Sequence, residues 1–97
     1  MTNYDLYSWV LRGTQRMAVI KVMDRPKIPR DIRKEAKEFD DKISKANTSR
    51  VLRDFVKKGI AVCLNEEQRT GRLYKLTKSG KAIRDEILKE EKHLTLI

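Results

Sequence analysis

Residues 43–59, with the sequence ISKANTSRVLRDFVKKG, determine how the rest of the chain is interpreted. They fit a helix, because Ser44 is a favoured N-cap residue and Gly59 suits the position just beyond a helix C-terminus. The apolar residues between these ends fall on one helical face: Val51, Leu52, Phe55 and Val56. The sequence therefore predicts an amphipathic helix that packs one side on a core.

The opposite face of this helix is small and polar near its start and cationic further along. At about 100° per residue, this face comprises Ala46, Ser49, Arg50, Arg53 and Lys57. A helix whose N-terminal half is polar and uncluttered can enter the major groove of DNA. The solvated outer face of an ordinary amphipathic helix has the same pattern, so the helix alone does not decide between the two interpretations.

After Gly59 the apolar period changes to that of a β-strand. Larger apolar residues alternate with small ones in this segment: Ile60, Val62 and Leu64 with Ala61 and Cys63. Residues 65–71, NEEQRTG, read as a turn, and residues 73–77 read as a second strand with Tyr74 and Leu76 on one face. The resulting hairpin carries cations at its tip and along its return strand: Arg69, Arg72 and Lys75. Such cations also protect exposed strand edges, but two basic elements in succession favour a shared surface.

The residues before the central helix predict two more helices. Thr14 can cap a helix that runs to about Met23, and Pro29 suits the first position of a helix over about residues 29–38. The expected inward residues are Met17, Ile20, Ile32 and Ala36, with Phe39 at the following corner. Helix, helix, short turn and helix make the core of a helix-turn-helix module, and a basic hairpin beside it is the wing of a winged helix.

The two ends of the chain carry apolar residues, and the sequence does not decide what they pack against. Residues 4–12 read as a short helix, although the alternation of a strand also fits. Their aromatic residues either pack on the chain's own core or meet a second copy: Tyr4, Tyr7 and Trp9. Thr77 or Ser79 caps a final helix over about residues 78–91, and the apolar tail HLTLI suggests homodimer packing rather than a frayed end.

The length and composition predict one domain and argue against several classes of protein. We expect a single domain over residues 1–97 with a core of about 13–77, and dimerisation elements in 1–12 and 78–97. One cysteine and one histidine exclude an internal disulfide and a Cys-rich metal site, and they argue against catalysis, so we expect no enzyme, metal or cofactor. No apolar run is long enough for a bilayer and no signal peptide is seen, so we expect a cytoplasmic protein with no membrane partner.

The positive charge of the chain is concentrated in two segments. The formal net charge is +9, to which residues 42–58 contribute +5 and residues 69–84 contribute +6. The rest of the chain therefore sums to −2. This distribution predicts a surface that binds a polyanion, formed where the two segments lie side by side.

Residues 50–80, RVLRDFVKKGIAVCLNEEQRTGRLYKLTKSG, resemble the recognition helix, the wing and the start of the last helix in MarR/ArsR-like winged helix-turn-helix regulators. The short archaeal members are the most similar. The motifs that carry the resemblance are Phe55 to Gly59, Ile60 to Leu64, Gly71-Arg72, and Tyr74, Leu76, Thr77 and Gly80. Residues 10–23, VLRGTQRMAVIKVM, resemble the first helix of that family, and the likeness extends over about residues 6–88.

The resemblance implies an α+β, mainly helical fold with a three-helix core, a two-stranded wing and a long C-terminal helix. It also implies sequence-specific binding of double-stranded DNA by a homodimer that regulates transcription. The positions that it implies for DNA contact are Lys45, Ala46, Asn47, Ser49, Arg50, Arg53 and Arg72, with Arg69 as a further wing residue. Two departures are Ile28, which is a weak cap before the second helix, and the absence of paired cysteines, so no metal sensing is implied.

The alternative is a winged-helix module that binds RNA or another protein, since the fold serves both purposes. Recognition of RNA usually adds exposed aromatic side chains that stack on bases. The aromatic residues of the basic segments are Phe55, which belongs to the apolar stripe, and Tyr74, so the RNA alternative is the weaker one. Nothing in the sequence marks a small-molecule effector, an operator or a direction of regulation.

Overall fold

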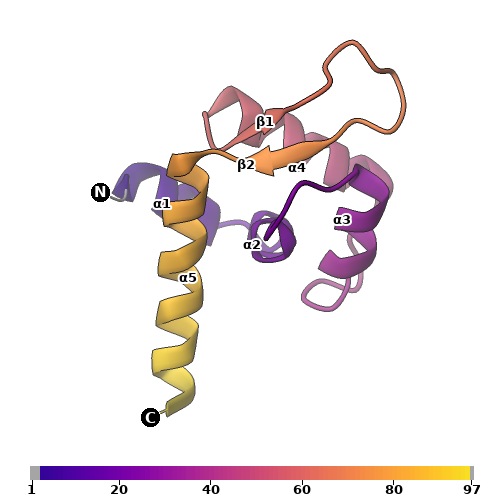
Figure 1. The fold of residues 1–97 in the computed structure, drawn as a ribbon. Helices are drawn as coiled ribbons and strands as arrows, with labels where there is room; N and C mark the ends of the chain where they lie inside the picture. The colour runs from indigo at the N-terminus through magenta and orange to yellow at the C-terminus, as the bar shows by residue number, and fades with distance from the viewer. Residues whose placement is uncertain (1–2, 97) are drawn as a thin grey trace.

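The computed structural model describes the backbone of residues 3–96 and the side chains of residues 3–93. Within these residues the chain is α+β and mostly helical, as expected, with five helices and a two-stranded antiparallel sheet (Figure 1). The elements are α1 (Tyr4–Leu11), α2 (Thr14–Val22), α3 (Pro29–Ala36), α4 (Lys45–Lys57), β1 (Ala61–Cys63), β2 (Tyr74–Leu76) and α5 (Lys78–Leu96). The apolar side chains expected in the tail, at Leu94, Leu96 and Ile97, lie outside the described side chains.

Helix α4 begins and ends where the sequence predicts. The Ser44 hydroxyl accepts a hydrogen bond from the Asn47 amide at 3.0 Å, and the Asn47 side chain accepts one from the Ser44 amide at 3.3 Å. This reciprocal capping box satisfies amides that a helix start otherwise leaves without a partner. At the other end Gly59 has φ +74°, a backbone conformation that residues with a Cβ rarely adopt.

The buried face of α4 differs from the expected apolar stripe at one residue. Val51, Leu52 and Phe55 are buried, but Val56 is 37% exposed, so its inward placement was wrong. Thr48 takes the fourth inward position at 1% exposure, and its hydroxyl donates to the Ser44 carbonyl oxygen at 2.9 Å. Burying Thr48 is tolerated because this hydrogen bond satisfies the hydroxyl.

The hairpin is anchored on both sides. Ala61 pairs with Leu76, and Cys63 pairs with Tyr74, in an antiparallel register. On the outer side of β2, the backbones of Lys27 and Tyr74 exchange two hydrogen bonds of 3.0 and 2.9 Å. The segment between α2 and α3 therefore fixes the hairpin against the helices, which the sequence did not predict.

The start of α5 is packed directly on the end of the α4–β1 turn. Thr77 caps the helix, since its hydroxyl oxygen accepts from the Gly80 amide at 3.1 Å, and the same hydroxyl donates to the Gly59 carbonyl oxygen at 2.6 Å. A Cβ on Gly80 would lie 2.1 Å from the Ile60 carbonyl oxygen. This close approach gives a physical reason for glycine in the segment that resembles the winged-helix motif.

Two further expectations were wrong. The N-cap of α2 is Gly13 rather than Thr14, and it makes no side-chain capping bond. Phe39 does not fill a corner of the core, since it is 50% exposed and lies 4.7 Å from the Lys21 ammonium.

Helix α1 confirms the helical interpretation of residues 4–12 and resolves much of the aromatic ambiguity. Trp9 packs edge-on against Phe55 with ring centroids 6.0 Å apart, and the Arg16 guanidinium lies 4.4 Å from the Trp9 ring. Tyr7 is half-buried beside α5, where desolvation and the carboxylates of α5 raise the pKa of its hydroxyl. Only Tyr4 of the three remains largely exposed, at 66%.

Helix α5 extends away from the rest of the fold (Figure 1). The Lys21 ammonium forms an ion pair of 2.6 Å with Glu91, and Arg84 Nε donates to the Lys21 carbonyl oxygen at 3.1 Å. These contacts hold the helix against α2. In the view of Figure 1, the loop between β1 and β2 rises at the top, whereas the C-terminal end of α5 points to the bottom.

Candidate nucleic-acid interface

A hollow of about 600 Å³ lies between α4, the start of α3 and the loop that joins β1 to β2. We call it the cationic groove. Its charged lining residues are Arg30, Lys45, Arg53, Arg69 and Arg72, and no carboxylate is among the described residues that line it. Its less polar lining consists of Ile28, Pro29, Leu52 and Tyr74. The groove therefore combines positively charged side chains with an apolar floor.

Helix α4 supplies one wall of the groove because of its four-residue spacing. Lys45, Ser49 and Arg53 follow one another at i and i+4, so they lie in a row along one edge of the helix. All three are exposed, while neighbouring Leu52 is 1% exposed and belongs to the core. The same packing that buries Leu52 thus turns this row toward the hairpin.

The loop that joins the strands, residues 64–73, supplies the facing wall and is held by its own side chains. Arg72 Nε donates to the Gln68 carbonyl oxygen at 2.6 Å, and its Nη2 donates to the Glu66 carbonyl oxygen at 3.2 Å. The Asn65 side chain accepts from the Leu73 amide at 2.7 Å and donates to the Gly71 carbonyl oxygen at 3.2 Å. These bonds cross the loop and define the path on which its arginines lie.

The structure brings together five of the eight residues that the sequence and the resemblance indicated. Those that line the cationic groove are Lys45, Ser49, Arg53, Arg69 and Arg72. Ala46 is exposed and Asn47 is used in the capping box, and neither lines the groove. Arg50 does not line this groove either, although it lies on the exposed face of α4 three residues before Arg53.

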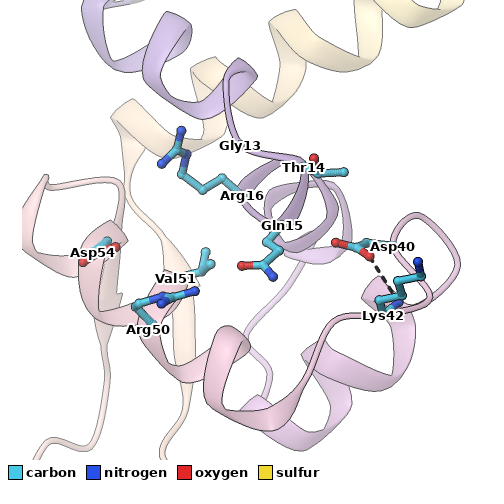
Figure 2. Close-up of a pocket in the computed structure, with 9 residues that line it drawn as sticks. All are labelled: Gly13, Thr14, Gln15, Arg16, Asp40, Lys42, Arg50, Val51 and Asp54. Atoms are coloured by element: carbon cyan, nitrogen blue, oxygen red, sulfur yellow. Dashed lines mark hydrogen bonds between the residues drawn. The ribbon is translucent and has the colours of Figure 1, made fainter.

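Arg50 lines a separate hollow of about 540 Å³ between α2, α4 and the turn before α4 (Figure 2). The side chains of Gln15 and Arg50 extend toward one another across it, whereas Arg16 extends away. Asp40 and Asp54 also line this hollow, so its charge is mixed. A polyanion is therefore less favoured here than in the cationic groove.

Sequence reasoning missed Arg30 as a groove residue. Arg30 follows Pro29 at the exposed start of α3 and lies outside the two basic segments. The sequence did carry one signal for Arg30. It lies in the first turn of α3, the helix that precedes α4 in a helix-turn-helix arrangement. Asp31 is adjacent in sequence and made this helix look acidic rather than basic at its start.

The described residues show neither a metal site nor a membrane span. No group of three or more His, Cys, Asp or Glu residues is arranged there to hold a metal ion. None of the described helices combines the length and the apolar character needed to cross a bilayer. Comparisons with protein-family models, curated proteins and solved structures found no match for this chain.

Proposed function

We propose that this chain is a winged helix-turn-helix protein that binds double-stranded DNA through the cationic groove and the exposed face of α4. The observation that supports this most is the lining of the groove: five cations from α3, α4 and the hairpin loop, with no described carboxylate among them. Cations without compensating acids attract a polyanion and release its counterions. The fold is compatible with this role, since α2, α3 and α4 would be the three-helix core and the hairpin would be the wing.

In this proposal α4 is the recognition helix. Its exposed polar face includes Ala46, Ser49, Arg50 and Arg53, and a single helix fits the width of the major groove. Arg53 and Lys45 would contact phosphates on the hairpin side, and Arg69 and Arg72 would contact the adjacent backbone or minor groove. Arg50, which does not line the groove, would contact a base edge.

We also propose that the protein acts as a homodimer that regulates transcription in the cytoplasm. A second copy would be met by α1 and α5, which carry the exposed Tyr4 and Leu88 and lie away from the hairpin loop (Figure 1). A two-fold dimer would place two copies of α4 against the two halves of a palindromic site. Sedimentation of the free protein tests the dimer independently of DNA.

The test is a titration of fluorescent duplex DNA at several NaCl concentrations. If each subunit neutralises about four phosphates, log affinity should fall with log salt at a slope of about −7 for the dimer. The double change Arg53→Gln with Arg69→Gln should reduce this slope, while the matched double change Lys34→Gln with Lys37→Gln, at two exposed lysines that do not line the groove, should reduce it less. A slope near zero for the unaltered protein would overturn the proposal.

Structured RNA is the competitor that the experiment must include. Tyr74, on the groove floor, is 8% exposed, so it offers little surface on which a base could stack. Duplex DNA should therefore win a competition against an RNA hairpin of the same length. A clear preference for RNA would replace the DNA proposal with the RNA-binding alternative.

A further inference from the structure

A second, smaller hollow of about 290 Å³ adjoins the cationic groove between the N-terminal halves of α3 and α4. It is lined by Pro29, Arg30, Arg33, Lys45, Thr48 and Ser49. Four of these residues line the cationic groove as well: Pro29, Arg30, Lys45 and Ser49. The two hollows therefore form one continuous surface that runs from the hairpin loop across the start of α4 to α3.

The chemistry of this smaller hollow suits a single phosphate group. Arg30, Arg33 and Lys45 bring three cations to it, and no carboxylate is among its described lining residues. The Ser49 hydroxyl is a further donor, whereas the Thr48 hydroxyl is already used in donating to the Ser44 carbonyl oxygen. Guanidinium groups present several N–H donors in a planar fork that matches phosphate oxygens.

Arg33 is held in place before any ligand arrives. Its Nε donates to the Ile43 carbonyl oxygen at 3.3 Å, which links α3 to the turn that leads into α4. The remaining guanidinium N–H groups are not used in hydrogen bonds within the described chain. The amides of Lys45 and Ala46 lack intrahelical acceptors at this positive end of the helix dipole, whereas the Asn47 amide is already capped by Ser44.

We infer that this hollow binds one backbone phosphate of the same DNA strand that lies in the cationic groove, with Arg30 and Arg33 as contacts that the sequence did not indicate. The inference rests on the proposed function and makes it more specific. A strand that contacts Arg69 and Arg53 in the groove continues past Lys45 to this phosphate pocket. Such a contact fixes the position of α4 along the duplex and carries no base preference of its own.

The first experiment compares salt dependence among matched variants. Arg33→Gln should reduce the slope of log affinity against log salt by about 0.9 per site and weaken binding by the same factor on every duplex sequence. Lys34→Gln removes the same charge from the neighbouring exposed position of α3 and should leave the slope nearly unchanged. Equal effects of the two changes would overturn the phosphate pocket and leave the proposed function standing.

Arg30→Gln guards against a folding defect in the Arg33 variant. Arg30 is exposed and makes no hydrogen bond in the described chain, so this change should leave the melting temperature unaltered. Because Arg30 lines both hollows, its slope should fall at least as much as that of Arg33→Gln. An unchanged slope for a folded Arg30→Gln variant, measured together with an unchanged slope for Arg33→Gln, would also overturn the pocket.

The second experiment separates the pocket from DNA binding as a whole. Inorganic phosphate is added to the free protein, and amide resonances are followed by NMR. Saturable shifts at Arg33, Lys45 and Ser49 that disappear in Arg33→Gln support the pocket, and their absence overturns it. If the unaltered protein binds phosphate there but binds no duplex, the proposed function fails while the anion chemistry of the pocket stands.

Discussion

Arg72 is bonded to its own loop: its Nε donates to the carbonyl oxygen of Gln68 at 2.6 Å. A second bond from its Nη2 reaches Glu66 at 3.2 Å, so two of the five guanidinium N–H groups serve the shape of the loop. The arginine that the family resemblance indicates as a wing contact is therefore also a residue that positions the wing. Arg69, which makes no hydrogen bond within the described chain, is free to contact a ligand.

Charge and loop shape can be separated at these two arginines. Arg72→Lys keeps the charge but cannot span both carbonyl oxygens, so duplex affinity should fall several-fold while the salt slope stays near that of the unaltered protein. Arg69→Gln should instead reduce the slope by about 0.9 per site. Fluorescence titrations at four NaCl concentrations measure both quantities. An Arg72→Lys variant with unaltered affinity would show that the loop bonds do not position the wing.

Gly80 should be a position of α5 that does not tolerate a larger side chain. A Cβ there would lie 2.1 Å from the Ile60 carbonyl oxygen, which is backbone and cannot turn away. Gly80→Ala should therefore lower the free energy of unfolding by about 1–3 kcal/mol or more, as overpacking does. Urea denaturation measures the change. Ser79→Ala, on the neighbouring half-exposed residue, is the control and should stay within about 0.5 kcal/mol. Equal stability of the two variants would contradict the close approach.

The sequence was sufficient for features that depend on local chemistry. Ser44 and Gly59 mark the ends of α4 because capping and positive φ are properties of a few residue types. The alternation after Gly59 indicated the hairpin for the same reason, since a half-buried strand needs a period of two. The mainly helical α+β class and the position of the hairpin followed from these two elements.

Features that depend on how elements pack could not be read in the same way. The rotation of α4 that buries Thr48 and exposes Val56 is set by its neighbours and amounts to a small part of a turn. The pairing of Lys27 with Tyr74 uses backbone atoms, which every residue has, and so leaves no side-chain signal. The separation of Arg50 from the groove has the same origin, because one exposed helical face can border two different hollows.

Lys27 is 4% exposed, and it should make stability depend on pH through Asp24. Its ammonium contacts the carboxylates of Asp24 at 2.6 Å and Glu35 at 2.7 Å, and it also donates to the Val22 carbonyl oxygen. The hydrogen bond from Lys27 is the main reason that the pKa of Asp24 lies below its ordinary value of 3.8. A carboxyl with a lowered pKa stabilises the fold at neutral pH, and this contribution is lost as the pH falls below about 4.

Asp24→Asn should therefore lower the melting temperature at pH 7, and the difference from the unaltered protein should narrow toward pH 3. The effect should be modest, since the Asp24 side chain is 45% exposed and solvent screens the pair. Asp41→Asn, on an exposed turn residue that makes no ion pair within the described chain, is the control. Melting curves recorded from pH 7 to pH 3 provide the comparison. A difference that stays constant over this range would rule out the linkage through Asp24.

Arg50 and Arg53 should differ in what they contribute to DNA binding, because they line two different hollows along the exposed face of α4. Arg53 lines the cationic groove, so Arg53→Gln should weaken all duplexes alike and reduce the salt slope. Arg50 shares its hollow with Asp40 and Asp54, which compensate its charge, so Arg50→Gln should mainly reduce the preference for a selected sequence over a random one. We expect this loss of discrimination to be about 1–3 kcal/mol if Arg50 contacts a base edge.

Selection of bound duplexes from a random pool supplies the preferred sequence, and titrations of both variants on preferred and random duplexes measure the effect. Identical losses on both duplexes for Arg50→Gln would make Arg50 a second phosphate contact and remove it from base recognition.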